Sequence, residues 1–269
     1  MKIICLGMSH RTAGVEFRER LAIPEAQLPA TLDEILNLPG IEECAILSTC
    51  NRVEVYAATG DEEPVFKVIH EFLDTRFSLG GQARLRFYEL PYRDSVRHLF
   101  RVAAGLDSMV VGETEVFGQV KRAYAVAHRR KTAGRHLHRL FQETFRIVKQ
   151  VRSRTRITQG ATSVGSVAVD LANRIFGDLT SCRVMVIGAG ETSRLTAKSL
   201  CSRGVRGIIV SNRNHDRALE LAREMDGEAI RFDDWNSRIG QIDIIISSTA
   251  APHPILTRDM VAAAGNSLE

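Results

Sequence analysis

The sequence lacks the features that would mark a secreted, metal-stapled or membrane-spanning protein. Its five cysteines are scattered through 269 residues, and no two of them form a Cys-x-x-Cys pair. This spacing argues against a disulfide framework and against a zinc site, so we expect no bound metal. No apolar run approaches the roughly 20 residues of a membrane span, and residues 1–7 are too short and too strand-like for a signal peptide. We therefore expect a cytoplasmic protein.

The chain also lacks internal repeats and low-complexity segments. Its hydrophobic content of 44% and charged content of 25% are ordinary globular values, and 269 residues suffice for two domains. The net charge of +4 is unevenly distributed, because residues 121–158 contain twelve Lys or Arg residues and a single acid, Glu143. We call residues 121–158 the basic stripe. It suits a polyanionic partner, and a solvated helix face is the alternative that the pattern leaves open.

Short predicted strands alternate with predicted helices in the first half of the chain. The strands are expected at 2–7, 43–47, 53–58 and 87–90, and the helices at 15–21, 28–38, 65–73 and 94–104. Residues 120–157 are expected to be helical nearly throughout, with a break near Gly134. This order predicts an α+β domain over residues 1–159.

The second half alternates strands with helices in a stricter order. Strands are expected at 182–187, 207–210, 229–232 and 242–247, and helices at 164–175, 194–202 and 216–225. Such alternation predicts a Rossmann-like, doubly wound parallel sheet over residues 160–269, which makes the chain as a whole an α/β protein.

The most informative stretch of the first half is Ser48-Thr49-Cys50-Asn51-Arg52, which follows the apolar run 44–47. A thiol is therefore expected where a buried strand ends. A positive charge such as that of Arg52 favours the thiolate, which is the nucleophilic form, and a guanidinium can also bind a carboxylate through two parallel hydrogen bonds. The pattern predicts a catalytic Cys50, against the alternative of an inert packing cysteine.

A dinucleotide fingerprint opens the second half. Gly188-x-Gly190-x-x-Ser193 follows a predicted strand and precedes a predicted helix, which is the context that a pyrophosphate-binding turn requires. At the end of the next strand the chain has Ser211-Asn212-Arg213, where an NAD enzyme places an acid. Arg213 can pair with a 2′-phosphate, which favours NADP, unless it is simply a surface residue after a strand.

A cysteine nucleophile and a hydride donor in one chain imply a two-step reaction. The thiolate attacks an activated acyl carbon to give a thioester, and hydride then reduces the thioester to an aldehyde. His98, on a predicted helix, could orient or activate a reacting group, or it could be an ordinary helix histidine. His10 has a weaker case, because it could simply anchor its turn.

The chain resembles the glutamyl-tRNA reductase family over essentially its whole length. The resemblance is carried by segments 7–13, 17–20, 48–54, 105–113, 118–121, 188–192, 211–213 and 247–250. It implies that Cys50 takes the glutamyl group from its tRNA as a thioester, with His98 as the activity-critical histidine, and that NADPH then reduces this thioester to glutamate-1-semialdehyde, the first step of five-carbon tetrapyrrole synthesis.

The resemblance also implies binding residues and partners. The glutamate moiety would be held by residues around the cysteine, namely Thr49, Asn51, Arg52, Ser108, Glu113, Thr114, Glu115 and Gln119. NADPH would be held by Gly188, Ala189, Gly190, Glu191, Thr192, Ser193, Ser211, Asn212 and Arg213. The partners would be glutamate-charged tRNA(Glu), which the basic stripe could contact, a second copy of the full-length protein, and the downstream aminomutase.

Two features of the sequence depart from the family pattern. The family usually has Pro-Gln where this chain has Thr114-Glu115, and an added carboxylate near a glutamate site could repel the substrate. Family members also continue well beyond residue 269 with a helical dimerisation domain, and the final Leu268-Glu269 resembles a cloning scar. We therefore expect a fragment in which the Rossmann-like sheet is incomplete and the dimerisation domain is absent.

Three other functions remain open from the residues. One is another NADP-dependent acyl-thioester reductase that acts on a carrier other than tRNA, although Arg52 and the basic stripe favour an acidic acyl group on a polyanion. A second is a non-catalytic tRNA- or partner-binding paralogue, for which Cys50 would be superfluous. A third is a shikimate-dehydrogenase-like reductase, which would share only the second-half pattern.

Overall fold

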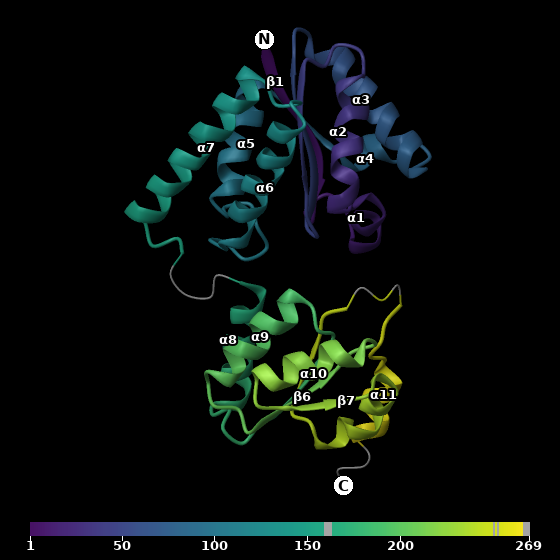
Figure 1. Cartoon of the computed structure of the whole chain (residues 1–269), viewed down its shortest axis with the longest axis vertical. Coiled ribbons are helices and arrows are strands. Elements are labelled where there is room, and N and C mark those ends of the chain that lie inside the picture. The colour runs from purple at the N-terminus through teal and green to yellow at the C-terminus, as the bar shows by residue number, and fades with distance from the viewer. Residues whose placement is uncertain (159–162, 250, 252, 266–269) are drawn as a thin grey trace. The chain divides into compact units, whose positions relative to one another are not determined.

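The computed structural model describes residues 1–158, 163–249, 251 and 253–265 (Figure 1). Internal contacts divide the chain into two units, Met1–Gly160 and Ala161–Glu269. The expected boundary at Gly160 lies outside the described residues. None of the described helices is both long enough and apolar enough to cross a membrane.

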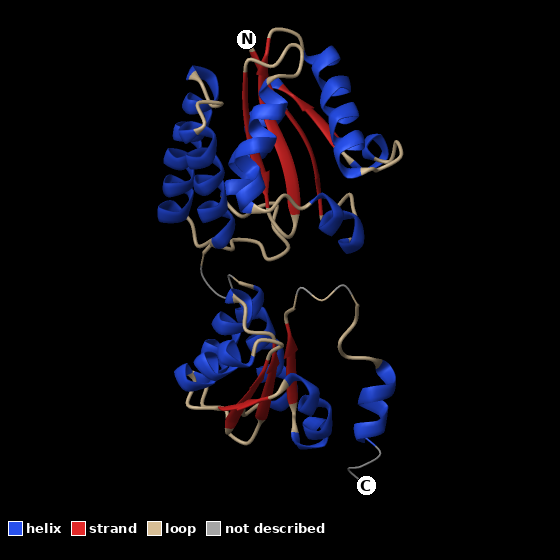
Figure 2. Cartoon of the chain, turned by 45° about the vertical axis from the view of Figure 1, so that its right-hand side comes forward, coloured by secondary structure: helices blue, strands red, loops and turns tan. Residues whose placement is uncertain are grey.

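The first unit is built on an antiparallel sheet. Its strands are β1 (Lys2–Ser9), β2 (Glu43–Ser48), β3 (Arg52–Thr59) and β4 (Tyr88–Pro91), in the order β2-β3-β1-β4. All eight residues of β3 are buried, because helices cover both faces of the sheet (Figure 2). The predicted strands and the α+β class are thereby confirmed.

Two groups of helices sandwich this sheet (Figure 1). On one side lie α1 (Val15–Leu21), α2 (Leu28–Leu36), α3 (Glu62–Phe77) and α4 (Ala83–Arg86), with the 3₁₀ turn η1 (Glu25–Gln27) before α2. On the other side lie α5 (Tyr92–Ala103), α6 (Glu115–Arg129) and α7 (Arg135–Arg154). A single hydrophobic core joins both groups to the sheet.

The predicted break in the long helical segment is confirmed and has a physical cause. Gly134 is the N-cap of α7, and a side chain there would meet the Glu43 carboxylate at 2.7 Å. Glu43 instead accepts the N–H groups of His136 and Leu137 at 3.0 and 2.8 Å, so a buried strand residue caps the helix. Residues 115–119, expected to be non-helical, form the first turns of α6.

The second unit contains a parallel sheet in the order β7-β6-β5-β8. Its strands are β5 (Arg183–Ile187), β6 (Gly207–Ser211), β7 (Glu228–Ile230) and β8 (Ile244–Ser247), and its helices are α8 (Val164–Phe176), α9 (Glu191–Cys201), α10 (His215–Glu224), the 3₁₀ helix η2 (Phe232–Gln241) and α11 (Arg258–Gly265). Along β5 successive side chains enter different apolar clusters, Val184 and Val186 in one and Met185 and Ile187 in the other. A core on each face of a parallel sheet is the doubly wound arrangement that the sequence predicts.

Candidate active site

Cys50 lies at the tip of the hairpin that joins β2 to β3. The Thr49 N–H donates to the Arg52 carbonyl at 2.9 Å, and the Thr49 hydroxyl accepts the N–H groups of Asn51 and Arg52, both at 3.1 Å. These bonds fold residues 49–51 into a tight turn. The turn leaves Cys50 exposed at the end of two otherwise buried strands.

Two neighbouring segments hold this turn through its carbonyl groups. The guanidinium of Arg18 on α1 donates to the Cys50 carbonyl at 3.3 Å and to the Ala13 carbonyl at 2.8 Å. The His10 N–H, directly after β1, donates to the Asn51 carbonyl at 2.8 Å. Arg18 is only 9% exposed, so its positive charge lies inside the protein beside the Cys50 turn.

Beneath the turn, Arg52 is buried between two carboxylates. Its Nη1 donates to Glu54 Oε1 at 2.7 Å, and both Nη atoms lie 3.3 Å from Asp107 Oδ2. The Asp107 carbonyl accepts a further bond from Nη2 at 2.6 Å. The Arg52 side chain is 2% exposed. The guanidinium is therefore fully engaged by carboxylates of the chain itself.

Glu54 is the centre of a larger buried network. Its carboxylate accepts hydrogen bonds from the hydroxyls of Tyr56 at 2.6 Å and Tyr88 at 2.5 Å, and it lies 2.8 Å from His98 Nε2. Gly7, paired with Glu54 across β1 and β3, makes room for it, because a Cβ at Gly7 would lie 2.7 Å from Glu54 Cγ. The glycine of β1 is thus required by the carboxylate on the neighbouring strand.

This network keeps Glu54 ionised. Burial alone raises the pKa of Glu54, but the Arg52 guanidinium and the hydrogen bonds from His98 and Tyr56 hold it well below the ordinary value. The pKa of the Tyr88 hydroxyl is raised in turn, by burial and by the Glu54 charge, so Tyr88 stays a hydrogen-bond donor. With an anionic Glu54 beside it, His98 Nε2 carries a proton and donates it to the carboxylate.

The environment of the Cys50 thiol differs from the expected one. Partial burial of the sulfur and then the Glu115 carboxylate raise the pKa of the Cys50 thiol, and Glu113 acts in the same direction. The charged side chain that lowers this pKa is Arg18. The prediction that Arg52 favours the thiolate is wrong for this structure, because two carboxylates neutralise Arg52 below the turn.

The loop between α5 and α6 closes the site on one side. Gly105 and Gly112 have φ values of +78° and +87°, and the Gly112 N–H donates to the Gly105 carbonyl at 3.0 Å. Asp107, in this loop, is the residue that contacts Arg52. The next hydroxyl, Ser108 Oγ, is buried without a hydrogen-bond partner among the described residues. A buried hydroxyl of this kind is available to a ligand.

The predicted dinucleotide turn lies at the carboxyl end of β5 in the second unit. Gly188 has a φ of +103°, and a Cβ at this position would overlap the Ser248 carbonyl oxygen. Gly190 is the N-cap of α9 and makes no side-chain cap, so the first N–H groups of this helix can face an anion. Ser193, in contrast, is buried, and its hydroxyl donates to the Ser248 carbonyl at 3.5 Å. The Ser193 side chain thus contacts the chain directly after β8, and the expected role of Ser193 in cofactor binding stays a prediction.

The end of β6 supplies the residues expected to select the cofactor. Ser211 is fully buried, and its hydroxyl donates to the Arg231 carbonyl at 3.5 Å, so its side chain also turns away from a ligand. Arg213 is exposed, and no ion pair engages it among the residues that the structure covers. Asn214 caps α10 by accepting the Arg217 N–H. An unpaired guanidinium thus lies beside a helix N-terminus, which suits a phosphate.

Comparisons with known proteins match the two units to two different family models. Residues 6–155 match the family model described as the N-terminal domain of glutamyl-tRNA(Glu) reductase, and residues 170–268 match that of shikimate/quinate 5-dehydrogenase. The glutamyl-tRNA reductase of Akkermansia muciniphila is 48% identical over 261 residues, which cover 96% of this chain and 76% of the relative. The chain belongs to the glutamyl-tRNA reductase family.

Two further members of the family are similar over nearly the whole chain. The glutamyl-tRNA reductase of Chromohalobacter salexigens is 44% identical, with 98% of this chain and 62% of the relative covered. The solved structure of the Methanopyrus kandleri enzyme is 39% identical with a TM-score of 0.53, covering 98% of this chain and 63% of that one. The chain thus spans between 62% and 76% of the length of these three relatives.

Membership in the family bears on the residues expected to hold glutamate. Glu113 and Glu115 raise the pKa of the Cys50 thiol. The Gln119 amide donates to Glu115 at 3.4 Å. Helix α6 therefore begins beside the site, with Thr114 as its N-cap. The Thr49 hydroxyl is committed to the turn. The roles of all eight residues toward a substrate stay predictions.

His98 lies in the same network as Glu54, and its Nε2 is also 3.3 Å from the Tyr88 hydroxyl. Atoms of Cys5, Glu54 and His98 lie within 4.8 Å of one another, a spacing that could hold a metal ion. The Arg52 charge on Glu54 opposes a cation there, and burial raises the pKa of the Cys5 thiol, so these residues do not favour a metal.

The basic stripe is less available than its composition suggests. Lys121 and Arg152 both lie over the Phe117 ring, at 4.2 and 4.7 Å from its centre. Arg130 pairs with Asp33, and Arg146 with Glu143. A substitution at Arg152 would therefore disturb packing and would be a poor probe of RNA binding.

Sequence reasoning missed Arg18 and Asp107, and it considered for His10 only the anchoring of its own turn and not that of the Cys50 turn. Each lies in a segment that carries the family resemblance, but none has a motif of its own. The burial of His10 lowers its pKa, with Arg52 adding to the effect, and its Nδ1 is buried without a partner among the described residues. The available cue was the clustering of polar residues at strand ends. Sequence patterns do not connect residues as far apart as Arg11 and Asp107, whose side chains meet across 96 positions.

Proposed function

We propose that the chain carries the catalytic steps of glutamyl-tRNA reduction with NADPH. The observation that carries this proposal is an exposed Cys50 on a turn anchored at two carbonyls, above the Arg52–Glu54–His98 network, in a chain of this family. The acyl carbon of the glutamyl ester is attacked by Cys50 Sγ, the bond to the tRNA ribose oxygen breaks, and that oxygen takes up a proton.

Hydride transfer completes the reaction. When bound, NADPH would supply a hydride to the thioester carbonyl carbon; the carbon–sulfur bond would break, Cys50 Sγ would take up a proton, and the products would be glutamate-1-semialdehyde, the Cys50 thiol and NADP⁺. The N-terminus of α9 would hold the pyrophosphate and Arg213 the 2′-phosphate. This product places the reaction at the start of five-carbon tetrapyrrole synthesis.

The chain's own side chains have separate tasks. Arg18 and His10 position the Cys50 turn. Arg52 offers the positive charge that a glutamyl carboxylate needs, provided that this carboxylate replaces Asp107 on the guanidinium. His98, held by Glu54, is assigned the task of holding or moving a proton during the reaction.

The test is the coupled reaction. Glutamyl-tRNA and NADPH are mixed with the protein, NADPH oxidation is followed by absorbance, and the aldehyde is trapped with a hydrazine reagent and identified by mass. We expect one trapped glutamate-derived aldehyde per NADPH oxidised, and none with Cys50→Ser. NADPH oxidation without the aldehyde, or aldehyde formation by the serine variant, would contradict the proposal.

A further inference from the structure

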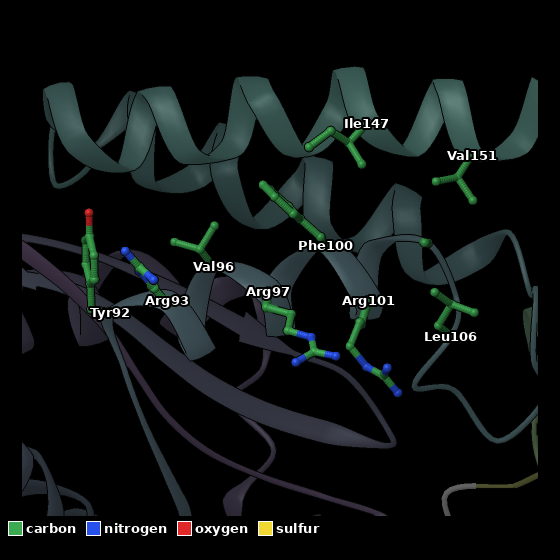
Figure 3. Close-up of a pocket in the computed structure, with 10 residues that line it drawn as sticks. Tyr92, Arg93, Val96, Arg97, Phe100, Arg101, Leu106, Ile147 and Val151 are labelled. Atoms are coloured by element: carbon green, nitrogen blue, oxygen red, sulfur yellow. The ribbon is translucent and has the colours of Figure 1, made fainter.

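A hollow of about 400 Å³ lies on the surface of the first unit between α5 and α7 (Figure 3). Its floor is apolar, formed by Val96 and Phe100 of α5 and by Ile147 and Val151 of α7. Tyr92, which is 51% exposed, stands at one end of this hollow. The hollow thus offers one exposed aromatic side chain, Tyr92, together with the partly buried ring of Phe100 in its floor.

A row of arginines borders the hollow on the α5 side. Arg93, Arg97 and Arg101 lie four residues apart and therefore share one face of α5, a row about 12 Å long at 1.5 Å per residue. All three are exposed, and none has a hydrogen bond or ion pair from its guanidinium to any residue that the structure describes. We call these three residues the arginine ridge.

The arginine ridge leads away from the candidate active site. Arg101 lies in the last turn of α5, and the loop that follows this helix carries Asp107 onto Arg52. Arg52 in turn closes the turn that presents Cys50. Arg101 is therefore the member of the arginine ridge that lies nearest in the chain to the Asp107 loop beneath the Cys50 turn.

A charged row beside an exposed aromatic side chain and an apolar hollow is a combination that binds single-stranded nucleic acid. Guanidinium groups contact successive phosphates, while bases stack on aromatic rings. An acidic amphipathic protein helix would also match the charge, but it would not require a ridge that ends close in the chain to the Asp107 loop. The basic stripe is the weaker candidate, since four of its side chains are engaged within the unit.

We propose that the arginine ridge binds the phosphates of the acceptor end of the charged tRNA, and that the hollow takes its unpaired bases. This inference rests on the proposed function and assigns the RNA surface of that same site. It predicts that the tRNA contacts closest to the ester are made by α5.

The experiment measures binding of uncharged tRNA to the full chain by fluorescence anisotropy between 50 and 200 mM salt. The test variant is R93Q/R97Q/R101Q. Its matched control, R84Q/R206Q/R223Q, removes the same charge from three exposed arginines whose guanidinium groups also lack partners among the described residues. Each lost phosphate contact lowers the slope of log affinity against log salt by about 0.7 to 0.9, so the ridge variant should lose about two to three units of slope.

A second probe tests the hollow. Transfer RNA that lacks its four unpaired 3′ nucleotides should bind the wild type several-fold more weakly than intact tRNA, and this difference should disappear in the ridge variant. Equal binding of intact and trimmed tRNA by the wild type would contradict the assignment of the hollow. An unchanged affinity and slope in the ridge variant would overturn the proposal that the arginine ridge binds tRNA. The hollow would then be left to another partner, such as an acidic helix.

Failure of this inference is distinguishable from failure of the proposed function. The same proteins are mixed with glutamyl-tRNA, and acylation of Cys50 is read by intact mass. Normal binding and acylation by the ridge variant would refute the ridge alone. A wild type that binds tRNA through the ridge but is never acylated would refute the catalytic proposal alone.

Discussion

The two units handle charge in opposite ways. In the first unit Arg18, Arg52, Glu54 and Asp107 are buried; the last three form one ion-pair network beneath the Cys50 turn, and Arg18 holds the carbonyl of the turn itself. In the described part of the second unit, the buried polar side chains are all hydroxyls, and Arg213 stays at the surface. The residues proposed for catalysis in the first unit therefore rest on its core, whereas those proposed to bind the cofactor in the second unit lie in loops at the carboxyl ends of its strands.

Substitutions should therefore act differently in the two units. A change in the buried network of the first unit removes stability together with function, because a buried charge loses its partner. A change at the surface of the second unit should alter ligand binding and leave its unfolding alone. Substitutions in each unit test this difference between buried and exposed charges.

The largest effect is expected from Glu54→Gln. This variant keeps the shape of the side chain but leaves the buried Arg52 with one carboxylate, so it should destabilise the first unit by about 3 kcal/mol or more. Urea unfolding of the full chain, followed by far-UV circular dichroism, measures the loss. The matched control Glu34→Gln, in an exposed pair with Arg76, should cost at most about 1 kcal/mol.

The Glu54→Gln effect should also depend on pH. Because the folded-state pKa of Glu54 is lowered, its contribution to stability is present above an unfolded-state pKa of about 4.3 and is lost as the pH falls. The difference between wild type and variant should therefore shrink from pH 7 to pH 3. A difference that grows on acidification would show that Glu54 is not ionised in the folded protein.

The next effect is expected from Gly188→Ala in the second unit. A non-glycine residue at a φ of +103°, with its Cβ against Ser248, should cost about 1–3 kcal/mol and abolish measurable NADPH binding. Gly207→Ala, where a Cβ would meet nothing within 4 Å, should change neither property strongly. Differential scanning calorimetry and NADPH titration measure both. Equal effects at the two glycines would show that the turn is not constrained.

Arg213→Gln should act on ligand binding alone. Loss of the charge that faces the 2′-phosphate should weaken NADPH binding about tenfold, leave NADH binding unchanged and leave unfolding unchanged. Arg223→Gln, at an exposed position near the end of α10, is the control. Titration by nucleotide fluorescence separates the two cofactors. Parallel losses for NADPH and NADH would remove Arg213 from cofactor selection.

The smallest effect is expected from Glu115→Gln. The Glu115 carboxylate raises the pKa of the Cys50 thiol, so its removal should increase the thiolate fraction and speed iodoacetamide alkylation of Cys50 about two- to threefold at pH 8. Arg18→Gln should slow the same alkylation, because Arg18 lowers this pKa. Mass spectrometry of the Cys50 peptide gives both rates. A slower reaction in Glu115→Gln would contradict this sign.

The sequence was sufficient for the fold and for the position of Cys50. Apolar runs and helical spacing predict β2, β3 and the alternating second unit, because these patterns depend only on residues that are neighbours in the sequence. The pair of carboxylates around Arg52 was not predictable from the sequence. Glu54 lies only two residues away, but Asp107 lies 55 residues away, after α5. Composition alone also could not show which residues of the basic stripe a ring or a carboxylate engages, and the tRNA contact of the stripe stays a prediction. Ala250, Leu268 and Glu269 lie outside the described residues.

The most direct test of the central claim is intact-mass analysis after mixing with glutamyl-tRNA in the absence of NADPH. The account predicts a glutamyl adduct on the wild type that hydroxylamine removes, and no adduct on Cys50→Ser, with equal tRNA binding by the two proteins. A wild type that binds tRNA without acquiring the adduct, or an adduct that persists in the serine variant, would contradict the assignment of Cys50 as the glutamyl acceptor.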